Sequence, residues 1–168
     1  MRFRKIDPRE LKGNPFQMIG DGWLLLAAGD KTAHNAMTVS WGGLGVLWGM
    51  PAATCYVRPQ RHTYGFMEKS DYFTLASFDG SFRDKLVLCG TKSGRDMDKA
   101  AACGFTPAYA EGDAPYYEEA DVVLVCKKLY YQDFDATHFL DARVEKNYPQ
   151  KDYHRMYVGE VVEVLVKE

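Results

Sequence analysis

The chain has 168 residues, of which 46% are hydrophobic and 26% charged, and this composition suits one globular domain with a closed core. A formal net charge of -2 argues against a protein that binds nucleic acid through a basic surface. No apolar run approaches the ~20 residues needed to cross a bilayer, and the first residues lack the apolar core of a signal peptide, so we expect a soluble, cytoplasmic protein without a membrane partner.

Four apolar runs in the first half of the chain predict buried strands, because each is short and bounded by Gly, Pro or polar residues. The residues before about Asn14 are polar, and we expect them on the surface. The predicted strands cover 22–29, 35–41, 52–59 and 71–78, with a glycine-rich connection over 42–51 and a helix over 60–70.

The second half of the chain mixes helical and extended patterns. Strands do not alternate regularly with helices, which argues against a doubly wound parallel sheet. The pattern favours a single domain over residues 1–168, mainly β, built as a small antiparallel barrel with helical insertions. We expect helices over 81–94 and 95–104, an irregular connector over 105–120, a strand over 121–134, a short helix over 135–146 and a final strand over 154–168.

The segment RPQRHTY at 58–64 is the first candidate for an anion site, since the chain has neither a GxGxxG nor a P-loop pattern. Arg58 ends a predicted strand, and Arg61 and Thr63 lie in the turn that opens the next helix. Two guanidinium groups and a hydroxyl at a helix N-terminus make a good seat for a phosphate dianion. A basic surface turn with Thr63 as helix cap explains the same residues.

The segment TKSGR at 91–95 is the second candidate. Lys92 and Arg95 flank Ser93 and Gly94 between two predicted helices, and glycine there lets backbone N–H groups point at an anion. A glycine that simply ends one helix before the next is an equally good explanation of this segment alone. Two such loops in one slightly acidic domain favour a shared phosphate ligand.

The predicted strand over 35–41 carries polar side chains on an otherwise apolar background: Asn35, Thr38, Ser40 and the indole of Trp41. Buried polar groups are costly unless they are hydrogen-bonded. A flat ring whose edge bonds to this strand would satisfy some of them. Alternatively, Thr38 and Ser40 face water and Trp41 belongs to the core.

The histidines and cysteines show no pattern typical of a metal site. No Ser-His-Asp or Cys-His arrangement is recognisable, and the cysteines form no CxxC pair, so we expect reduced thiols and no metal. These residues are His34, His62, His138 and His154, and Cys55, Cys89, Cys103 and Cys126.

Four stretches together resemble the flavin reductase-like family of FMN-binding split barrels, and its flavoredoxin-type branch in particular. They are NAMTVSWGGLGVLWGMP, RPQRHTYGFMEKSDYFTLASF, GTKSGRDMDK and YHRMYVGEVVEVL. Each is modest alone, but their order and spacing from about Asn14 to the C-terminus are specific. The resemblance implies a six-stranded antiparallel Greek-key split barrel, non-covalent FMN, and a homodimer with the flavin sites near the subunit interface.

The resemblance also implies which residues contact FMN. The strand over 35–41 would line the isoalloxazine ring, the 58–64 segment would hold the phosphate and ribityl chain, and the 91–95 loop would close over the flavin. The flavin itself would carry the chemistry, with His138 as the candidate catalytic side chain, supplied by either subunit. The implied contacts are Asn35, Met37, Thr38, Ser40, Trp41, Arg58, Gln60, Arg61, Thr63, Tyr64, Thr91, Lys92, Ser93, Gly94, Arg95 and His138. His154 and Arg155 match a shared motif whose role the residues do not reveal.

The activity that the resemblance implies is that of an FMN-dependent oxidoreductase of the flavin reductase or flavoredoxin type. Electrons would come from NAD(P)H or from a redox-protein partner. A non-enzymatic FMN-binding electron carrier would use the same residues and lack a productive nicotinamide pocket. A split barrel that binds pyridoxal phosphate or haem is a third reading, in which haem is disfavoured because no His stands in a recognisable ligand context.

Overall fold

The computed structural model describes residues 2–168 and is mainly β. The strands are β1 (Phe3–Ile6), β2 (Leu24–Gly29), β3 (His34–Val39), β4 (Gly42–Leu47), β5 (Met50–Val57), β6 (Tyr72–Ser77), β7 (Pro107–Tyr109), β8 (Pro115–Tyr117), β9 (Val122–Asp133) and β10 (Arg155–Lys167). The helices are α1 (His62–Lys69), α2 (Arg83–Thr91), α3 (Lys99–Cys103) and α4 (Ala142–Glu145). Short 3-10 or π turns are η1 (Pro8–Glu10), η2 (Gln17–Asp21), η3 (Gly80–Phe82), η4 (Glu111–Asp113) and η5 (Ala136–His138).

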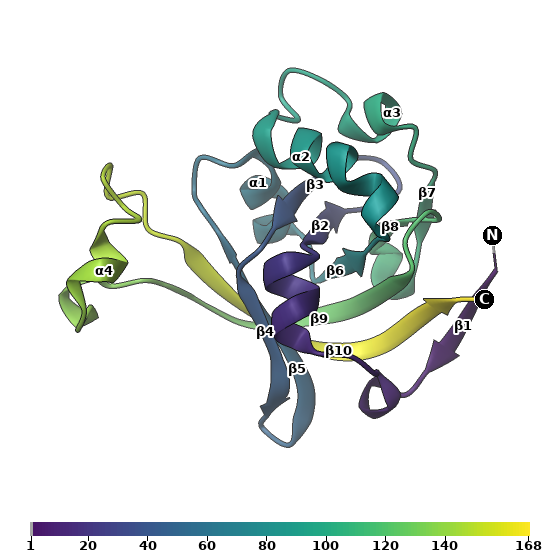
Figure 1. The fold of residues 1–168 in the computed structure, drawn as a ribbon, viewed down its shortest axis with the longest axis horizontal. Coiled ribbons are helices and arrows are strands. Elements are labelled where there is room, and N and C mark those ends of the chain that lie inside the picture. The colour runs from purple at the N-terminus through teal and green to yellow at the C-terminus, as the bar shows by residue number, and fades with distance from the viewer. Residues whose placement is uncertain (1) are drawn as a thin grey trace.

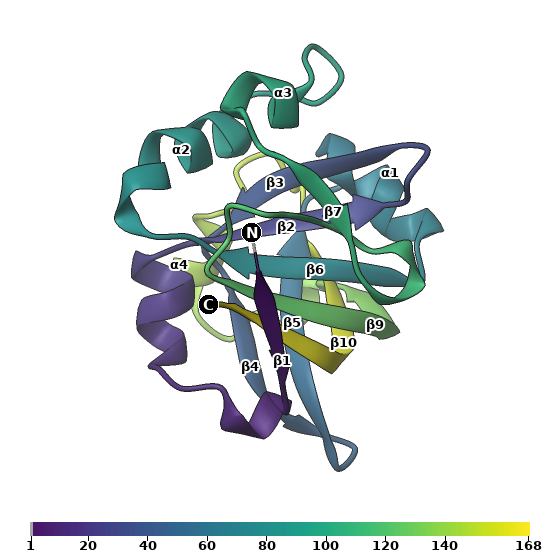
Figure 2. The same ribbon diagram turned by 90° about the vertical axis from the view of Figure 1, so that its right-hand side faces the viewer.

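One antiparallel sheet in the order β3-β2-β6-β9-β10-β5-β4 makes up the barrel, and β1 pairs with β10 outside this path. β3 and β4 follow each other in sequence but lie at opposite ends of the sheet, which leaves the barrel split between them. Figures 1 and 2 show α2 and α3 on the β3 side of this barrel. Figure 1 also shows an arm, formed by the segment between β9 and β10, that contains α4 and projects from the barrel. The expected antiparallel split barrel is confirmed, with more strands than the six expected.

The two faces of β2 explain why the stretch over 22–29 is apolar throughout. Leu24, Leu26 and Ala28 point into the barrel core. Leu25 and Ala27 join a second core, formed with residues of α2, α3 and β8. A strand buried on both faces reads as a continuous apolar run instead of an alternating one.

The expectation of a glycine-rich connection over 42–51 is wrong, because this segment is most of a β-hairpin. β4 pairs with β5 from Gly42 opposite Cys55 to Leu47 opposite Met50. The turn residues Trp48 and Gly49 both have positive φ, 51° and 76°, as a type I′ hairpin turn requires. The glycines hid the strand because glycine has low strand propensity.

Several other boundaries differ from those expected. The connector over 105–120 contains the small β7–β8 hairpin, and the helix expected over 135–146 is two short pieces, η5 and α4. The surface segment at the start contains β1, which pairs with the end of β10. The helices expected over 60–70 and 81–94 are confirmed as α1 and α2, whereas only the five residues of α3 are helical within 95–104.

No helix among residues 2–168 combines the length and hydropathy needed to cross a membrane. Over the same residues, no group of three His, Cys, Asp or Glu side chains is placed to hold a metal ion.

Candidate functional site

The polar side chains of β3 are hydrogen-bonded to the helices that cover it. The buried Asn35 amide donates to the Thr63 hydroxyl at 2.8 Å, near the start of α1. The Thr38 hydroxyl donates to the carbonyl of Leu86 in α2 at 2.6 Å. The Thr38 hydroxyl is therefore bonded to protein, and the residue is only partly exposed to solvent. Met37 packs in the barrel core and also lines the hollow described below.

The Arg61 guanidinium connects α1 to the end of α2. Arg61 is the residue before α1, and its Nη1 donates to the carbonyl of Gly90 at 2.8 Å. Its Nη2 is buried and has no hydrogen-bond partner in the described part of the chain. Burial lowers the pKa of this guanidinium, although arginine stays charged in proteins. Arg61 therefore holds a buried charged donor that has no acceptor among the described residues.

The 91–95 loop lies against both β3 and α1. A Cβ on Gly94 would come within 2.0 Å of the Asn35 Oδ1 and 2.9 Å of His62, so only glycine allows this approach. The Arg95 Nη1 donates to the carbonyl of Gln60 at 3.0 Å. The two segments predicted from sequence to form the halves of one anion site are therefore in direct contact.

The remaining side chains of this loop lie at its surface. The Arg95 N–H donates to the Ser93 hydroxyl at 3.2 Å, which shapes the turn. The Thr91 hydroxyl donates to the carbonyl of Val87 inside its own helix. Lys92 is exposed and available to an anion from solvent.

A hollow opens where β3 ends, and Arg61 lines it. Its wall combines apolar, aromatic and cationic groups, and six of its residues are among the predicted flavin contacts. The lining residues are Met37, Thr38, Val39, Ser40, Trp41, Tyr56, Arg58, Arg61 and His154. Such a mixture of flat apolar walls and a few polar groups is typical of a small-molecule site.

Arg58 and Gln60 are held by the end of the arm that precedes β10. The Arg58 Nη1 forms an ion pair with the Asp152 carboxylate at 2.7 Å, and the Gln60 amide donates to the same oxygen at 2.6 Å. Gln60 and Arg58 together lower the pKa of Asp152. The charge of Arg58 is thus largely neutralised within the chain, which leaves Arg61 as the cation of the hollow without a carboxylate partner.

His154 is a wall residue whose role the sequence did not reveal. It is buried, its Nδ1 lies 2.8 Å from the Tyr148 hydroxyl, and its ring centroid is 5.2 Å from that of Trp41. Burial, with the nearby Arg58, lowers its pKa to about 4, so it is neutral near pH 7. Its sequence signal was the shared motif that it forms with Arg155, just before β10.

Tyr64 and His138 are two of the predicted contacts that do not line the hollow in this single chain. Tyr64 packs against the barrel core, and the Arg155 guanidinium lies 5.4 Å from its ring. His138 is exposed in η5, on the arm that projects from the barrel in Figure 1. A contact from His138 to the hollow would have to come from another subunit.

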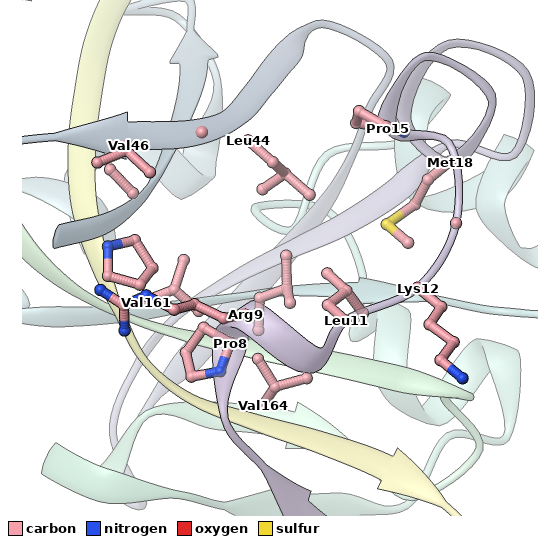
Figure 3. A pocket seen from close by; sticks show the side chains of 15 residues that line it. Pro8, Arg9, Leu11, Lys12, Pro15, Met18, Leu44, Val46, Val161 and Val164 are labelled. Atoms are coloured by element: carbon pink, nitrogen blue, oxygen red, sulfur yellow. The ribbon is translucent and has the colours of Figure 1, made fainter.

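Two of the further hollows that border the barrel differ in their relation to this one. One continues from the first past Ser40, Trp41 and Tyr56, and adds Phe16 and Phe134 to an aromatic wall. The other, in Figure 3, lies between the N-terminal segment and the barrel, where Arg9 and Lys12 are the charged residues among apolar ones. It shares no residue with the predicted site, so we do not assign it the same role.

Solved structures with the same fold support this architecture. Flavoredoxin from Methanosarcina acetivorans matches with a TM-score of 0.70 and 21% identity, over 95% of this chain and 76% of that one. Flavoredoxin of Desulfovibrio vulgaris (Miyazaki F) matches with a TM-score of 0.69 and 22% identity, over 87% and 69%. An FMN-binding protein from Thermus thermophilus matches with a TM-score of 0.71 and 19% identity, over 98% and 82%. At such identities the likeness shows the fold alone.

Sequence comparison gives the family. No curated protein sequence matches this chain. The model of the flavin reductase like domain matches residues 17–168, which include the whole barrel except β1 and all of the residues that line the hollow. The chain therefore belongs to the flavin reductase-like domain family.

Proposed function

We propose that this protein binds FMN without a covalent link and acts as an oxidoreductase that passes electrons through it. The observation that carries the proposal is Arg61, which lines the hollow and whose buried Nη2 has no acceptor among the described residues. A buried charged donor without an acceptor is costly. A phosphate oxygen would supply that acceptor, and the family and its FMN-binding structural relatives supply the chemical context.

The residues around the hollow fit the two ends of FMN. The phosphate would lie against the basic and hydroxyl side chains at the start of α1 and in the 91–95 loop. These are Arg61, Lys92, Ser93 and Arg95. Charge-assisted hydrogen bonds of this kind are the strong ones in phosphate binding. The wall that runs from Met37 to Trp41, with Tyr56 and His154, would lie along the ring.

FMN, when bound, supplies the redox chemistry, and the protein supplies placement and electrostatics. The neutral His154 would add a ring-edge hydrogen-bonding group without adding charge, since burial keeps its pKa low. Arg61 would add fixed positive charge beside the cofactor. We propose NAD(P)H as the electron donor, because the aromatic hollow that continues past Trp41 offers Phe16 and Phe134 as flat surfaces for a second ring.

The test is a visible-absorption titration of the purified full chain with FMN, followed by steady-state oxidation of NADH and NADPH. Saturable perturbation of the flavin spectrum at micromolar FMN, with nicotinamide oxidation faster than free FMN supports, is the expected result. FMN binding without faster nicotinamide oxidation would show that the protein is a non-enzymatic FMN-binding electron carrier. Absence of binding at micromolar FMN would overturn the proposal.

A further inference from the structure

Cys89 and Cys103 lie side by side between α2 and α3. The Cys89 Sγ is 3.7 Å from the Cys103 Sγ, and both side chains are buried in the second core, 1% and 4% exposed. Cys103 also donates its S–H toward the carbonyl of Lys85 at 3.8 Å. The S–H of Cys89 is then the one that points at the Cys103 sulfur. The two sulfurs need approach by only about 1.7 Å to reach disulfide bonding distance.

The pair flanks the loop that contributes to the candidate site. Residues 91–95 lie between the two cysteines in sequence, and the carbonyls of Cys89 and Gly90 both accept hydrogen bonds from cationic side chains. The Lys99 ammonium donates to the carbonyl of Cys89 at 2.8 Å, and Arg61 donates to the carbonyl of Gly90 at 2.8 Å. A covalent link at Cys89 would therefore act on the backbone that anchors Arg61.

We propose that Cys89 and Cys103 are a redox modification site that forms a reversible disulfide and closes a covalent ring around the 91–95 loop. The oxidant class is a low-molecular-weight disulfide such as oxidised glutathione. The thiolate of Cys103 attacks one glutathione sulfur, which forms a mixed disulfide and releases one glutathione thiolate. The thiolate of Cys89 then attacks the Cys103 Sγ, and the second glutathione leaves as a thiolate. The protein dithiol loses two electrons and two protons, and these reduce one glutathione disulfide to two thiols.

Cys103 is the entry point because it ends the short α3, just before Gly104 in the left-handed conformation. Short helices open locally at little cost, and Figures 1 and 2 show α3 at the outer edge of the molecule. Burial raises the pKa of Cys89 to about 12, which keeps it a thiol until α3 opens. Oxidation would thus be slow, selective for this pair, and dependent on local opening.

Peptide mapping of the full chain after incubation with oxidised glutathione and alkylation of the remaining thiols tests the site. Trypsin should place Cys89 in peptide 86–92, but it places Cys103 and Cys126 together in peptide 100–127. The Cys126→Ala variant is therefore the working background, since it leaves Cys103 as the only cysteine of that peptide. We expect peptides 86–92 and 100–127 to be joined, and to separate on reduction with dithiothreitol.

The matched control is Cys103→Ser in the same background, in which Cys89 should stay free for alkylation. Retention of both free thiols in the parent after the oxidant, or pairing of Cys89 with Cys55 instead, would overturn the proposal.

A second measurement rests on the proposed function. We expect the disulfide form to release FMN at least about threefold more slowly than the dithiol form, because the loop opens less often once its ends are linked. An unchanged release rate with the disulfide in place would overturn the coupling to the FMN site. Failure to bind FMN in either form would contradict the proposed function and leave the peptide map as an independent test.

Discussion

Arg61 is the residue on which the proposed site depends most, because its Nη1 donates to the carbonyl of Gly90 while its buried Nη2 has no acceptor within residues 2–168. We expect Arg61→Ala to weaken FMN binding by about 1–3 kcal/mol, roughly 5- to 150-fold, the range for loss of a charge-assisted hydrogen bond. Fluorescence titration with FMN measures the effect. Arg83→Ala is the matched control, since Arg83 also donates to backbone carbonyls, those of Asp21 and Gly22, but does not line the hollow.

Equal FMN affinity in the Arg61→Ala protein and the wild type would show that the phosphate does not bind at Arg61. A loss of affinity in Arg83→Ala as large as that in Arg61→Ala would show instead that the effect arises from general destabilisation.

His154 should make the fold sensitive to mild acid. Burial lowers its pKa from 6.5 to about 4, so between these values the unfolded chain binds a proton that the folded chain does not. The stability contribution is complete above about pH 6.5 and is lost as the pH falls toward 4, by about 2 kcal/mol at pH 5 relative to pH 7. Urea unfolding at the two pH values measures it.

His154→Gln should flatten this pH dependence, because glutamine can still bond to the Tyr148 hydroxyl but does not titrate. His138→Gln, on the exposed arm, should keep the wild-type dependence. Identical pH profiles for His154→Gln and the wild type would remove His154 as the cause.

The loop between α2 and α3 is the element whose shape the site needs. We expect Gly94→Ala to destabilise the protein by about 1–3 kcal/mol, the usual cost of forcing extra volume into a packed contact, because the new Cβ would meet Asn35. Thermal or urea unfolding measures the loss, and FMN affinity should fall with it.

Gly65→Ala is the matched control, because a Cβ at Gly65 in α1 meets nothing within 4 Å. That change should be neutral or stabilise by up to ~1 kcal/mol, since alanine has the higher helix propensity. A Gly94→Ala protein as stable as Gly65→Ala would mean that the loop does not lie against β3 as described.

Secondary structure was predictable where one local signal dominated. The apolar run of β2 and the helical spacing of α1 both gave the right element type. β4 was missed because three of its six residues are glycine, and its strand identity comes from pairing with β5. The long β9 and β10 were expected, but their partners could not be, since register depends on contacts far apart in sequence.

The site was predictable in its parts and less so in its assembly. The two basic loops were predicted to share a ligand, and the hydrogen bond from Arg95 to the carbonyl of Gln60 brings them together. The pairing of Arg58 with Asp152 was beyond sequence reasoning, because the two residues are 94 positions apart. The burial of His154 and of the Lys99 ammonium likewise follows from tertiary packing that no local pattern encodes.

For the whole molecule, we propose a homodimer. The tip of the β4–β5 hairpin exposes Val46 and Trp48, 75% and 59% exposed, and the Trp48 ring lies 6.3 Å from that of Tyr130 on β9. An exposed apolar patch of this kind is typical of an interface, and a second copy of the chain would cover it. Sedimentation should give about twice the chain mass of 19.1 kDa.

Trp48→Asn should shift this equilibrium toward the monomer without harming the hairpin, because asparagine is favoured at the first central position of a type I′ turn. Leu140→Asn changes a fully exposed residue on the arm. It tests whether the arm, rather than the hairpin tip, forms the dimer interface. A wild-type mass of 19.1 kDa at micromolar concentration would contradict the dimer.

We propose that the phosphate of FMN contributes most of what distinguishes this site from a simple ring-binding site, and a parallel titration with FMN and riboflavin measures that contribution. The two ligands share the ring and the ribityl chain and differ in the phosphate that Arg61 and the 91–95 loop would hold. We predict micromolar or tighter binding of FMN and about 10- to 150-fold weaker binding of riboflavin, as the loss of charge-assisted bonds implies. Equal affinity for the two ligands would contradict it.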